Sequence, residues 1–254
     1  MRVSARKKAE LKAKKRQRLL ILAGAILAAV AIAAVVAVAS GSKEHKANAC
    51  VIADVSESTD LARQRYGSEF ARFATSIGLD GSGEICVIFA AADPLAESLA
   101  EPLFVGPATS NEGGLGEVPD VEGKVAVARE DLEAHLADPS IREKGSALIE
   151  AATDAAQFLQ PGDRLLFLSD GLQWTPGLHL AREELTPGAI ATLLDSLEGE
   201  DLVPDLEGVE ISFPYLLYHP GGLDQEKVRQ IIAFWEAWAA RAEATITVRE
   251  PVKT

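Results

Sequence analysis

The stretch Ala49-Cys50-Val51-Ile52-Ala53-Asp54-Val55-Ser56-Glu57-Ser58 decides the fold. Its first seven residues are almost continuously apolar, without the alternation of a strand that has one wet face. Such a strand is covered on both faces, as in a parallel sheet, so we expect one over residues 49–55. Polar residues follow directly, and residues 58–77 then carry an apolar stripe at helical spacing. The stretch therefore predicts a buried strand, a polar loop and a helix.

Further along the chain, short apolar runs continue to alternate with helical patterns. We expect strands over residues 84–91, 124–128, 164–169, 209–217 and 244–248. We expect helices over residues 129–137, 146–159, 187–197 and 224–242, and a surface loop over 107–122. This alternation predicts an α/β domain over residues 49–254, with a doubly wound, mostly parallel sheet flanked by helices.

The N-terminal segment has a different composition. Residues 1–18 hold nine Lys or Arg and one acid, and residues 19–39 are 21 positions without charge or proline. About 20 apolar residues span a bilayer as a helix, and basic flanks stay in the cytoplasm. We expect a cytoplasmic tail over 1–18, a single transmembrane helix over 19–40, a linker over 41–48 and an extracytoplasmic domain after it. The alternative is a signal peptide cleaved after Ala39, because Ala37-Val38-Ala39 fits a small-x-small cleavage site.

The charge of the chain argues against two classes of partner. Taking residues 1–18 away from the totals of 25 basic and 38 acidic residues leaves 16 basic and 37 acidic, a net charge of −21. Such a surface repels nucleic acid and anionic lipid headgroups, so we expect neither as a ligand. Cys50 and Cys86 lie in two strand-like runs, and either a disulfide or two reduced core thiols fits them.

Three loops place oxygen atoms where a parallel sheet binds its ligands. Asp54, Ser56 and Ser58 follow the first strand at alternate positions, so their side chains point the same way while the chain is extended. Ser146 begins a helix, where its hydroxyl group is available, and Asp170 follows a buried strand. Ligands sit beyond the carboxyl ends of the strands in such sheets, and carboxylate and hydroxyl oxygens suit a hard cation such as Mg²⁺.

In these motifs the chain resembles a von Willebrand factor type A (VWA) domain with a metal-ion-dependent adhesion site. The resemblance covers residues 48–250 and rests on Asp-x-Ser-x-Ser at 54–58, Gly145-Ser146-Ala147-Leu148 and Ser169-Asp170-Gly171. The late Phe234-Trp235-x-x-Trp238 helix is similar to that of bacterial stand-alone members.

The resemblance implies a Rossmann-like fold and a bound Mg²⁺, with Mn²⁺ or Ca²⁺ as substitutes. The implied metal ligands are Asp54, Ser56, Ser58, Ser146 and Asp170. It also implies a protein partner that supplies an acidic side chain to the ion. Ser146 departs from the family, which has Thr there; Ser keeps the hydroxyl group but loses the methyl group that restrains its rotamer.

Other functions have less support. The chain has no Gly-x-Ser-x-Gly elbow, His-Glu-x-x-His motif or Walker loop, and its four His share no ligand spacing, so we expect no enzyme. One alternative is an interaction domain without a bound metal, in which the loop residues only cap helices. A metal-dependent hydrolase is the other, although such sites usually contain more carboxylates. Tyr66, Trp174 and the loop 172–180 are expected near the metal and are possible partner contacts.

Overall fold

The computed structural model describes residues 49–79, 83–91, 103–105, 121–138, 145–217 and 222–248. The expected tail, membrane helix and linker of residues 1–48 lie outside these ranges. Within the described ranges, no helix combines the length and the apolar character needed to cross a membrane.

The described strands form one six-stranded sheet in the order β3-β2-β1-β4-β5-β6. The strands are β1 (Ala49–Asp54), β2 (Gly83–Ala90), β3 (Leu103–Val105), β4 (Arg164–Leu168), β5 (Glu210–Phe213) and β6 (Thr245–Val248). Every neighbouring pair is parallel except β2 with β3, which is antiparallel. The expected α/β class and mostly parallel sheet are therefore confirmed.

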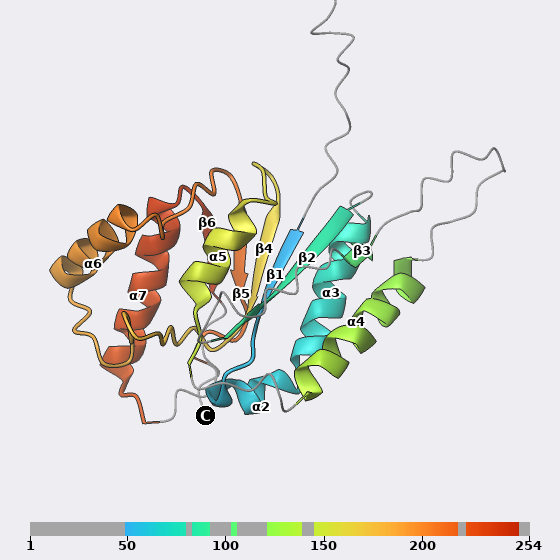
Figure 1. Ribbon diagram of the computed structural model, residues 1–254, viewed down its shortest axis with the longest axis horizontal. Coiled ribbons are helices and arrows are strands. Elements are labelled where there is room, and N and C mark those ends of the chain that lie inside the picture. The colour runs from blue at the N-terminus through green and yellow to red at the C-terminus, as the bar shows by residue number, and fades with distance from the viewer. Residues whose placement is uncertain are drawn as a thin grey trace, which may run out of the picture. The chain divides into compact units, whose positions relative to one another are not determined.

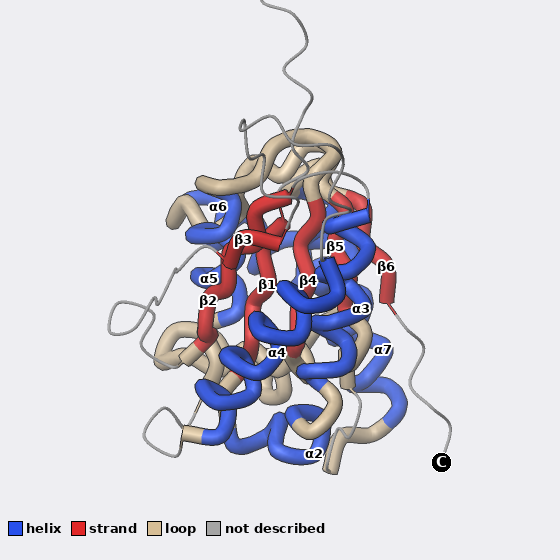
Figure 2. The backbone as a smooth tube through the Cα atoms, turned by 90° about the vertical axis from the view of Figure 1, so that its right-hand side faces the viewer, coloured by secondary structure: helices blue, strands red, loops and turns tan. Residues whose placement is uncertain are grey.

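Helices cover both faces of the sheet (Figure 1). The helices are α2 (Asp60–Arg63), α3 (Tyr66–Leu79), α4 (Val121–Ala137), α5 (Leu148–Ala156), α6 (Pro187–Gly199) and α7 (Gln225–Arg241), with a short 3-10 helix η1 (Glu57–Thr59) before α2. Figure 2 shows α3 and α4 in front of the strands, and in Figure 1 α5, α6 and α7 lie on the opposite side.

Strand β1 contributes to two hydrophobic cores because its side chains alternate between the faces. Cys50 and Ile52 pack with the α5, α6 and α7 side, whereas Val51 and Ala53 pack with the α3 and α4 side. All six residues of β1 are buried. This double burial is the physical reason for the uninterrupted apolar run in the sequence.

Two local expectations were wrong. Residues 124–128 are part of helix α4 and not a strand, because Val125, Ala128, Leu132 and Leu136 form one buried helical face. Five residues are too few to separate the two periods in that segment. The antiparallel edge strand β3 was not expected, and the strand predicted over 209–217 is shorter, with only Glu210–Phe213 in the sheet.

The strand order creates the place where a ligand is expected. Proceeding outward from the middle of the sheet, β1, β2 and β3 run to one edge and β4, β5 and β6 run to the other. The chain thus changes direction between β1 and β4. Open parallel sheets bind ligands outside the carboxyl ends of the strands at such a switch point. Asp54 ends β1, and Asp170 follows β4 by two residues.

Candidate metal centre

Asp54 is the best-connected residue of the site. Its side chain is completely buried, and its Oδ1 accepts a hydrogen bond from the backbone N–H of Ser56 at 2.8 Å. Its Oδ2 accepts a bond from the hydroxyl group of Ser169 at 2.6 Å. Burial raises the pKa of the Asp54 carboxyl above its ordinary value, while the bonds from Ser169 and Ser56 oppose that rise. Ser169 was quoted in the sequence motif, but its role as a fixed donor to Asp54 was not predicted.

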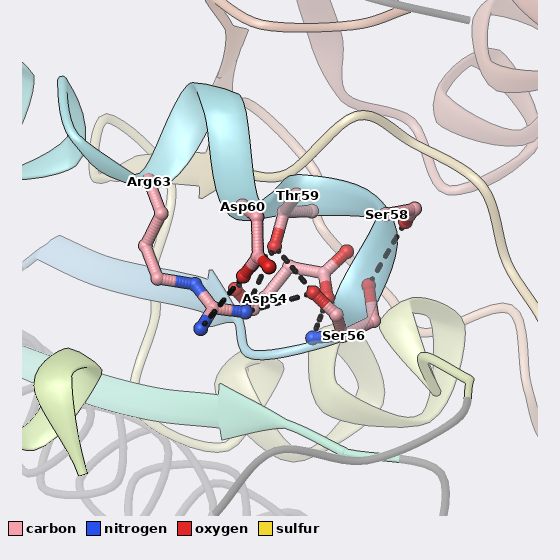
Figure 3. A network of polar contacts seen from close by, with 6 residues as sticks. All are labelled: Asp54, Ser56, Ser58, Thr59, Asp60 and Arg63. Atoms are coloured by element: carbon pink, nitrogen blue, oxygen red, sulfur yellow. Dashed lines mark hydrogen bonds and ion pairs between the residues drawn. The ribbon is translucent and has the colours of Figure 1, made fainter. Parts of the chain in front are cut away.

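The loop after Asp54 is held from behind by a polar network that Figure 3 shows. The Thr59 hydroxyl group lies 2.8 Å from the Ser56 carbonyl oxygen and 3.2 Å from the Asp54 carbonyl oxygen. Arg63 Nη2 donates to the same Ser56 carbonyl oxygen at 2.7 Å. Because these bonds use backbone carbonyl groups, they fix the loop and leave its serine hydroxyl groups available. In the sequence, Thr59 and Arg63 are four residues apart, as on one face of a helix, but neither was predicted to support the site.

The two loop serines share a contact with each other. Ser56 Oγ and Ser58 Oγ lie 3.1 Å apart. Neither caps a helix through its side chain: η1 begins after Ser56 and α2 after Thr59, and no side-chain cap bond forms at either position. Ser58 lies inside η1, and the N-cap positions belong to Ser56 and Thr59.

Asp170 is the second buried carboxylate. Its Oδ1 accepts a bond from the Leu172 backbone N–H at 3.0 Å, and its exposure is 3%. Burial and the nearby charge of Asp54 raise the pKa of the Asp170 carboxyl to about 7, against the lowering effect of Leu172 and of the Ser58 hydroxyl group. Neither Asp54 nor Asp170 forms an ion pair with a basic side chain within the described ranges.

The loop that carries Asp170 is fixed from the core. Gly171 has φ +77, and a Cβ atom there would lie 2.1 Å from Leu216 Cδ1, so the position requires glycine on both grounds. Trp235 Nε1 donates to the Gly171 carbonyl oxygen at 2.9 Å, and the Leu217 N–H donates to the Asp170 carbonyl oxygen at 2.8 Å. Helix α7 thereby positions the second carboxylate through its buried tryptophan.

Ser146 supplies the third loop. Its backbone pairs with Trp174 through bonds of 3.0 Å and 2.9 Å. Its Oγ is buried and has no hydrogen-bond partner within the described part of the chain, although the hydroxyl group lies close enough to Asp54 to lower the pKa of that carboxyl. It does not cap α5, whose N-cap is Ala147 with no side-chain bond.

All five predicted ligand residues thus converge at the β1–β4 switch point. Ser56 Oγ contacts Ser58 Oγ. The hydroxyl groups of Ser56 and Ser146 lie close enough to Asp54 to lower the pKa of its carboxyl, and the Ser58 hydroxyl group does the same for Asp170. A pocket of about 180 Å³ adjoins the site, and two of the five residues, Ser56 and Ser58, line it. It is lined by Ser56, Glu57, Ser58, Gly145, Leu172, Trp174 and His179.

Other predicted features differ in outcome. Tyr66 is completely buried, with its ring 5.6 Å from that of Tyr215, so the expectation that it contacts a partner was wrong. Its buried hydroxyl group has no hydrogen-bond partner among the described residues. Cys50 and Cys86 are direct register partners in β1 and β2, and both are free thiols. The hydrogen bond with Cys86 and burial raise the pKa of Cys50.

The donor set is rich in hydroxyl groups. No group of three or more His, Cys, Asp and Glu suited to a metal occurs within the described residues. The site has two carboxylates and three serine hydroxyl groups, so it differs from zinc sites and from acid-rich calcium sites. A hard cation that keeps several waters is the ion such a set fits.

Comparisons with known proteins identify no family. No protein-family model matches the chain, and no curated protein matches it significantly. Among solved structures, the crystal structure of the human COPII-coat protein Sec24c is similar, with 12% sequence identity and a TM-score of 0.37. The match covers 81% of this chain and 30% of that one, so the chain spans less than a third of the length of that protein.

Proposed function

We propose that the domain is a VWA-like module that binds a divalent cation, with Mg²⁺ as the preferred ion, and uses it to recognise an acidic side chain of a partner protein. The observation that carries the proposal is the pair Asp54 and Asp170. Both carboxylates are buried, they repel each other, and no described basic side chain neutralises them. Buried charges are costly unless they are paired or coordinate a metal.

The hydroxyl groups support the same conclusion. If the loops only capped helices, the side chains of Ser56, Ser58 and Ser146 would accept bonds from helix N–H groups, and none does. Ser146 Oγ is buried without a hydrogen-bond partner among the described residues, which costs free energy in the absence of a ligand. This argues against the alternative of a domain without a functional metal.

The five predicted ligand residues have two different roles in binding the ion. Asp54 and Asp170 provide negative charge, with Asp54 oriented by Ser169 and the Ser56 N–H. Ser56, Ser58 and Ser146 provide neutral oxygen atoms, so the five predicted ligands together carry at most two negative charges. A bound ion supplies positive charge and an open position that a carboxylate can fill. Because residues 19–254 carry a net charge of −21, the ion is the local attraction that an acidic partner group needs.

We further propose that residues 19–40 anchor the chain, with the metal site on the extracytoplasmic side. The length of the apolar stretch and the nine basic residues before it support this orientation.

Metal binding is tested by urea unfolding of the full chain in mild detergent, with Mg²⁺ or with a chelator. The three tryptophans lie at 174, 235 and 238, so their fluorescence reports on the domain alone. A ligand at 100 times its Kd stabilises the native state by about 2.7 kcal/mol. We expect Mg²⁺ to stabilise the wild type and not Asp54→Ala.

Asp205→Ala is the matched control. Like Asp54, Asp205 accepts a hydrogen bond from the backbone N–H two residues later, that of Glu207, at 3.1 Å. Asp205 is exposed, however, and it precedes β5, whereas the metal site follows the carboxyl ends of β1 and β4. We expect this variant to respond to Mg²⁺ like the wild type. A wild type that gains nothing from millimolar Mg²⁺, Mn²⁺ or Ca²⁺ contradicts the proposal.

A further inference from the structure

Trp174 is an exposed aromatic residue beside the metal site that the proposed function does not use. Its side chain is 42% exposed, whereas Trp235 and Trp238 are completely buried. It lines the pocket over the site together with Leu172 and His179. A large exposed indole at a binding pocket is unusual for a residue with only a structural role, because it keeps apolar surface in water.

The segment that carries Trp174 is held by backbone hydrogen bonds on both sides of the residue. Thr175 and Leu178 exchange backbone bonds of 2.9 Å and 3.3 Å, and the Leu180 N–H donates to the Gln173 carbonyl oxygen at 3.1 Å. Trp174 itself pairs with the backbone of Ser146 on the other side. The aromatic residue is therefore fixed to the same loop that carries a predicted metal ligand.

Gln173 adds a side-chain connection between the two loops. It is buried; its Oε1 accepts a bond from the Ile149 N–H at 3.1 Å, and its Nε2 donates to Glu150 at 2.8 Å. These bonds join the Trp174 segment to the first turn of α5. A preformed contact surface of this kind binds with little loss of conformational entropy.

The indole ring is also oriented. It stacks on the His179 ring, with centroids 4.9 Å apart and planes 28° from parallel. Burial and the charge of Arg182 lower the pKa of His179, so its imidazole is neutral at pH 7. The wall formed by Leu172, Trp174 and His179 is thus uncharged, next to the hydroxyl groups of Ser56 and Ser58.

The pocket fits amino-acid side chains of a partner better than a free cofactor. Its volume is about 180 Å³, below the roughly 300–1,000 Å³ of typical small-molecule sites. Its lining combines the loop serines and Glu57 with the uncharged wall. The acidic domain disfavours a second copy of this chain as occupant, because residues 19–254 carry a net charge of −21.

We propose that Trp174 is the specificity-determining residue of this site, and that it takes an apolar or aromatic side chain adjacent in sequence to the partner's acidic residue. The inference rests on the proposed function. The metal side of the pocket takes the carboxylate, and the Trp174 wall takes the neighbouring side chain. Rigid aromatic residues at the centre of a contact are typical binding hot spots.

The test uses four capped synthetic peptides and the full chain in mild detergent. Two contain Glu with Phe directly after or directly before it, acetyl-Gly-Glu-Phe-Gly-amide and acetyl-Gly-Phe-Glu-Gly-amide. The third replaces Phe by Ala in the first peptide, and the fourth replaces Glu by Gln in the first peptide. Affinities are measured by isothermal titration calorimetry with Mg²⁺ and with a chelator, for the wild type, Trp174→Ala and Trp174→Phe.

We expect at least one Glu-Phe peptide to bind about tenfold more tightly than the Glu-Ala peptide in Mg²⁺. Trp174→Ala should abolish that preference without changing the response of urea unfolding to Mg²⁺, and Trp174→Phe should retain most of it. Phe158→Ala is the control, because Phe158 is 49% exposed but lies beyond the far end of α5. It should leave every affinity unchanged.

The outcomes separate the two proposals. Equal binding of the Glu-Phe and Glu-Ala peptides, both dependent on Mg²⁺, overturns the role of Trp174 and leaves the metal site intact. Binding of the Gln peptide as tight as that of the Glu-Phe peptide, together with a preference for Phe that persists with chelator, overturns the role of the metal and keeps the Trp174 wall. A Trp174-dependent dimer in sedimentation without peptide, or no binding of any peptide, overturns the inference that this wall takes a partner's side chain.

Discussion

Replacing Asp170 by Asn is expected to stabilise the metal-free domain while abolishing its response to Mg²⁺. Asn has nearly the same shape as Asp, and its Oδ1 can still accept the bond from the Leu172 N–H that Asp170 accepts at 3.0 Å. What the change removes is a buried negative charge close to Asp54. The two effects have opposite signs because the same charge that costs stability in the free domain attracts the ion.

The magnitude follows from the pKa of the carboxyl group. Burial and the Asp54 charge raise the pKa of Asp170 from 3.8 to about 7. One pKa unit corresponds to about 1.4 kcal/mol, so the ionised form costs up to about 4 kcal/mol at pH 8. Imperfect pairing of the new amide group offsets part of that, and we expect Asp170→Asn to gain about 2 kcal/mol at pH 8.

The pH dependence has a definite sign. The pKa of Asp170 is higher in the folded than in the unfolded chain, so the folded state binds more protons between about pH 4 and pH 7. The stability of the metal-free wild type therefore falls as the pH rises through that window. The advantage of Asp170→Asn should accordingly be larger at pH 8 than at pH 5.

The assay is urea unfolding of the full chain in mild detergent, followed by tryptophan fluorescence at pH 5 and pH 8, with chelator and with Mg²⁺. Asp205→Asn is the matched control and should be neutral at both pH values. The reasoning is refuted if Asp170→Asn is less stable than the wild type with chelator at pH 8. Such a result would mean that hydrogen bonds stabilise the carboxylate more than burial penalises it.

Three further changes test other parts of the structure. Ser146→Ala should weaken Mg²⁺ binding about tenfold in a calorimetric titration and leave metal-free stability unchanged or slightly higher, because its buried Oγ has no hydrogen-bond partner among the described residues. Tyr66→Phe should be neutral or stabilising by about 1 kcal/mol in urea unfolding with chelator, since it removes a buried hydroxyl group that has no hydrogen-bond partner within the described ranges; a loss of that size would reveal such a partner. Cys50 and Cys86 should resist a thiol reagent until urea unfolds the chain, and both should then react; rapid reaction in buffer would contradict their burial.

The sheet was predictable because a strand that is buried on both faces has an almost continuously apolar sequence. Strands β1 and β4 are apolar along most of their length since both faces are covered, and their ends are marked by Asp54 and by Ser169 with Asp170. Helix α4 was not predictable over residues 124–128, where four apolar residues in five fit a strand and a helix equally. Its true period appears only when Leu132 and Leu136 are included.

The ligand set was predictable but its support was not. The spacing of Asp54, Ser56 and Ser58 and the two later loops identify which oxygen atoms meet, because parallel strands end at one edge. The residues that orient them act across long separations: Ser169 on Asp54, Trp235 on Gly171, and Gln173 on α5. No local pattern in a single sequence specifies contacts of that kind.

Tyr66 shows that nearness to a site along the chain does not place a residue on the surface around that site. Its position after the metal loop made it a possible partner contact, although it also belongs to the apolar stripe of residues 58–77. The structure follows the stripe, because Tyr66 begins α3 and is buried in the core against Tyr215.

The burial of Asp54 and Asp170 together is the feature that most needs an explanation from function. Either residue could be Asn with little change of shape, and the metal-free domain would then lose a repulsion between two desolvated charges. Instead, several further hydrogen bonds hold the two carboxylates in place. Ser169 donates to the Asp54 carboxylate, and Trp235 and Leu217 donate to the backbone of the loop that carries Asp170. Charges that are both unfavourable in isolation and firmly oriented are the arrangement expected when a cation completes the site, because orientation lowers the free-energy cost of binding it. The same reasoning gives the exposed indole of Trp174 its place: it is fixed to the Ser146 loop, so whatever the ion attracts meets a surface that is already formed.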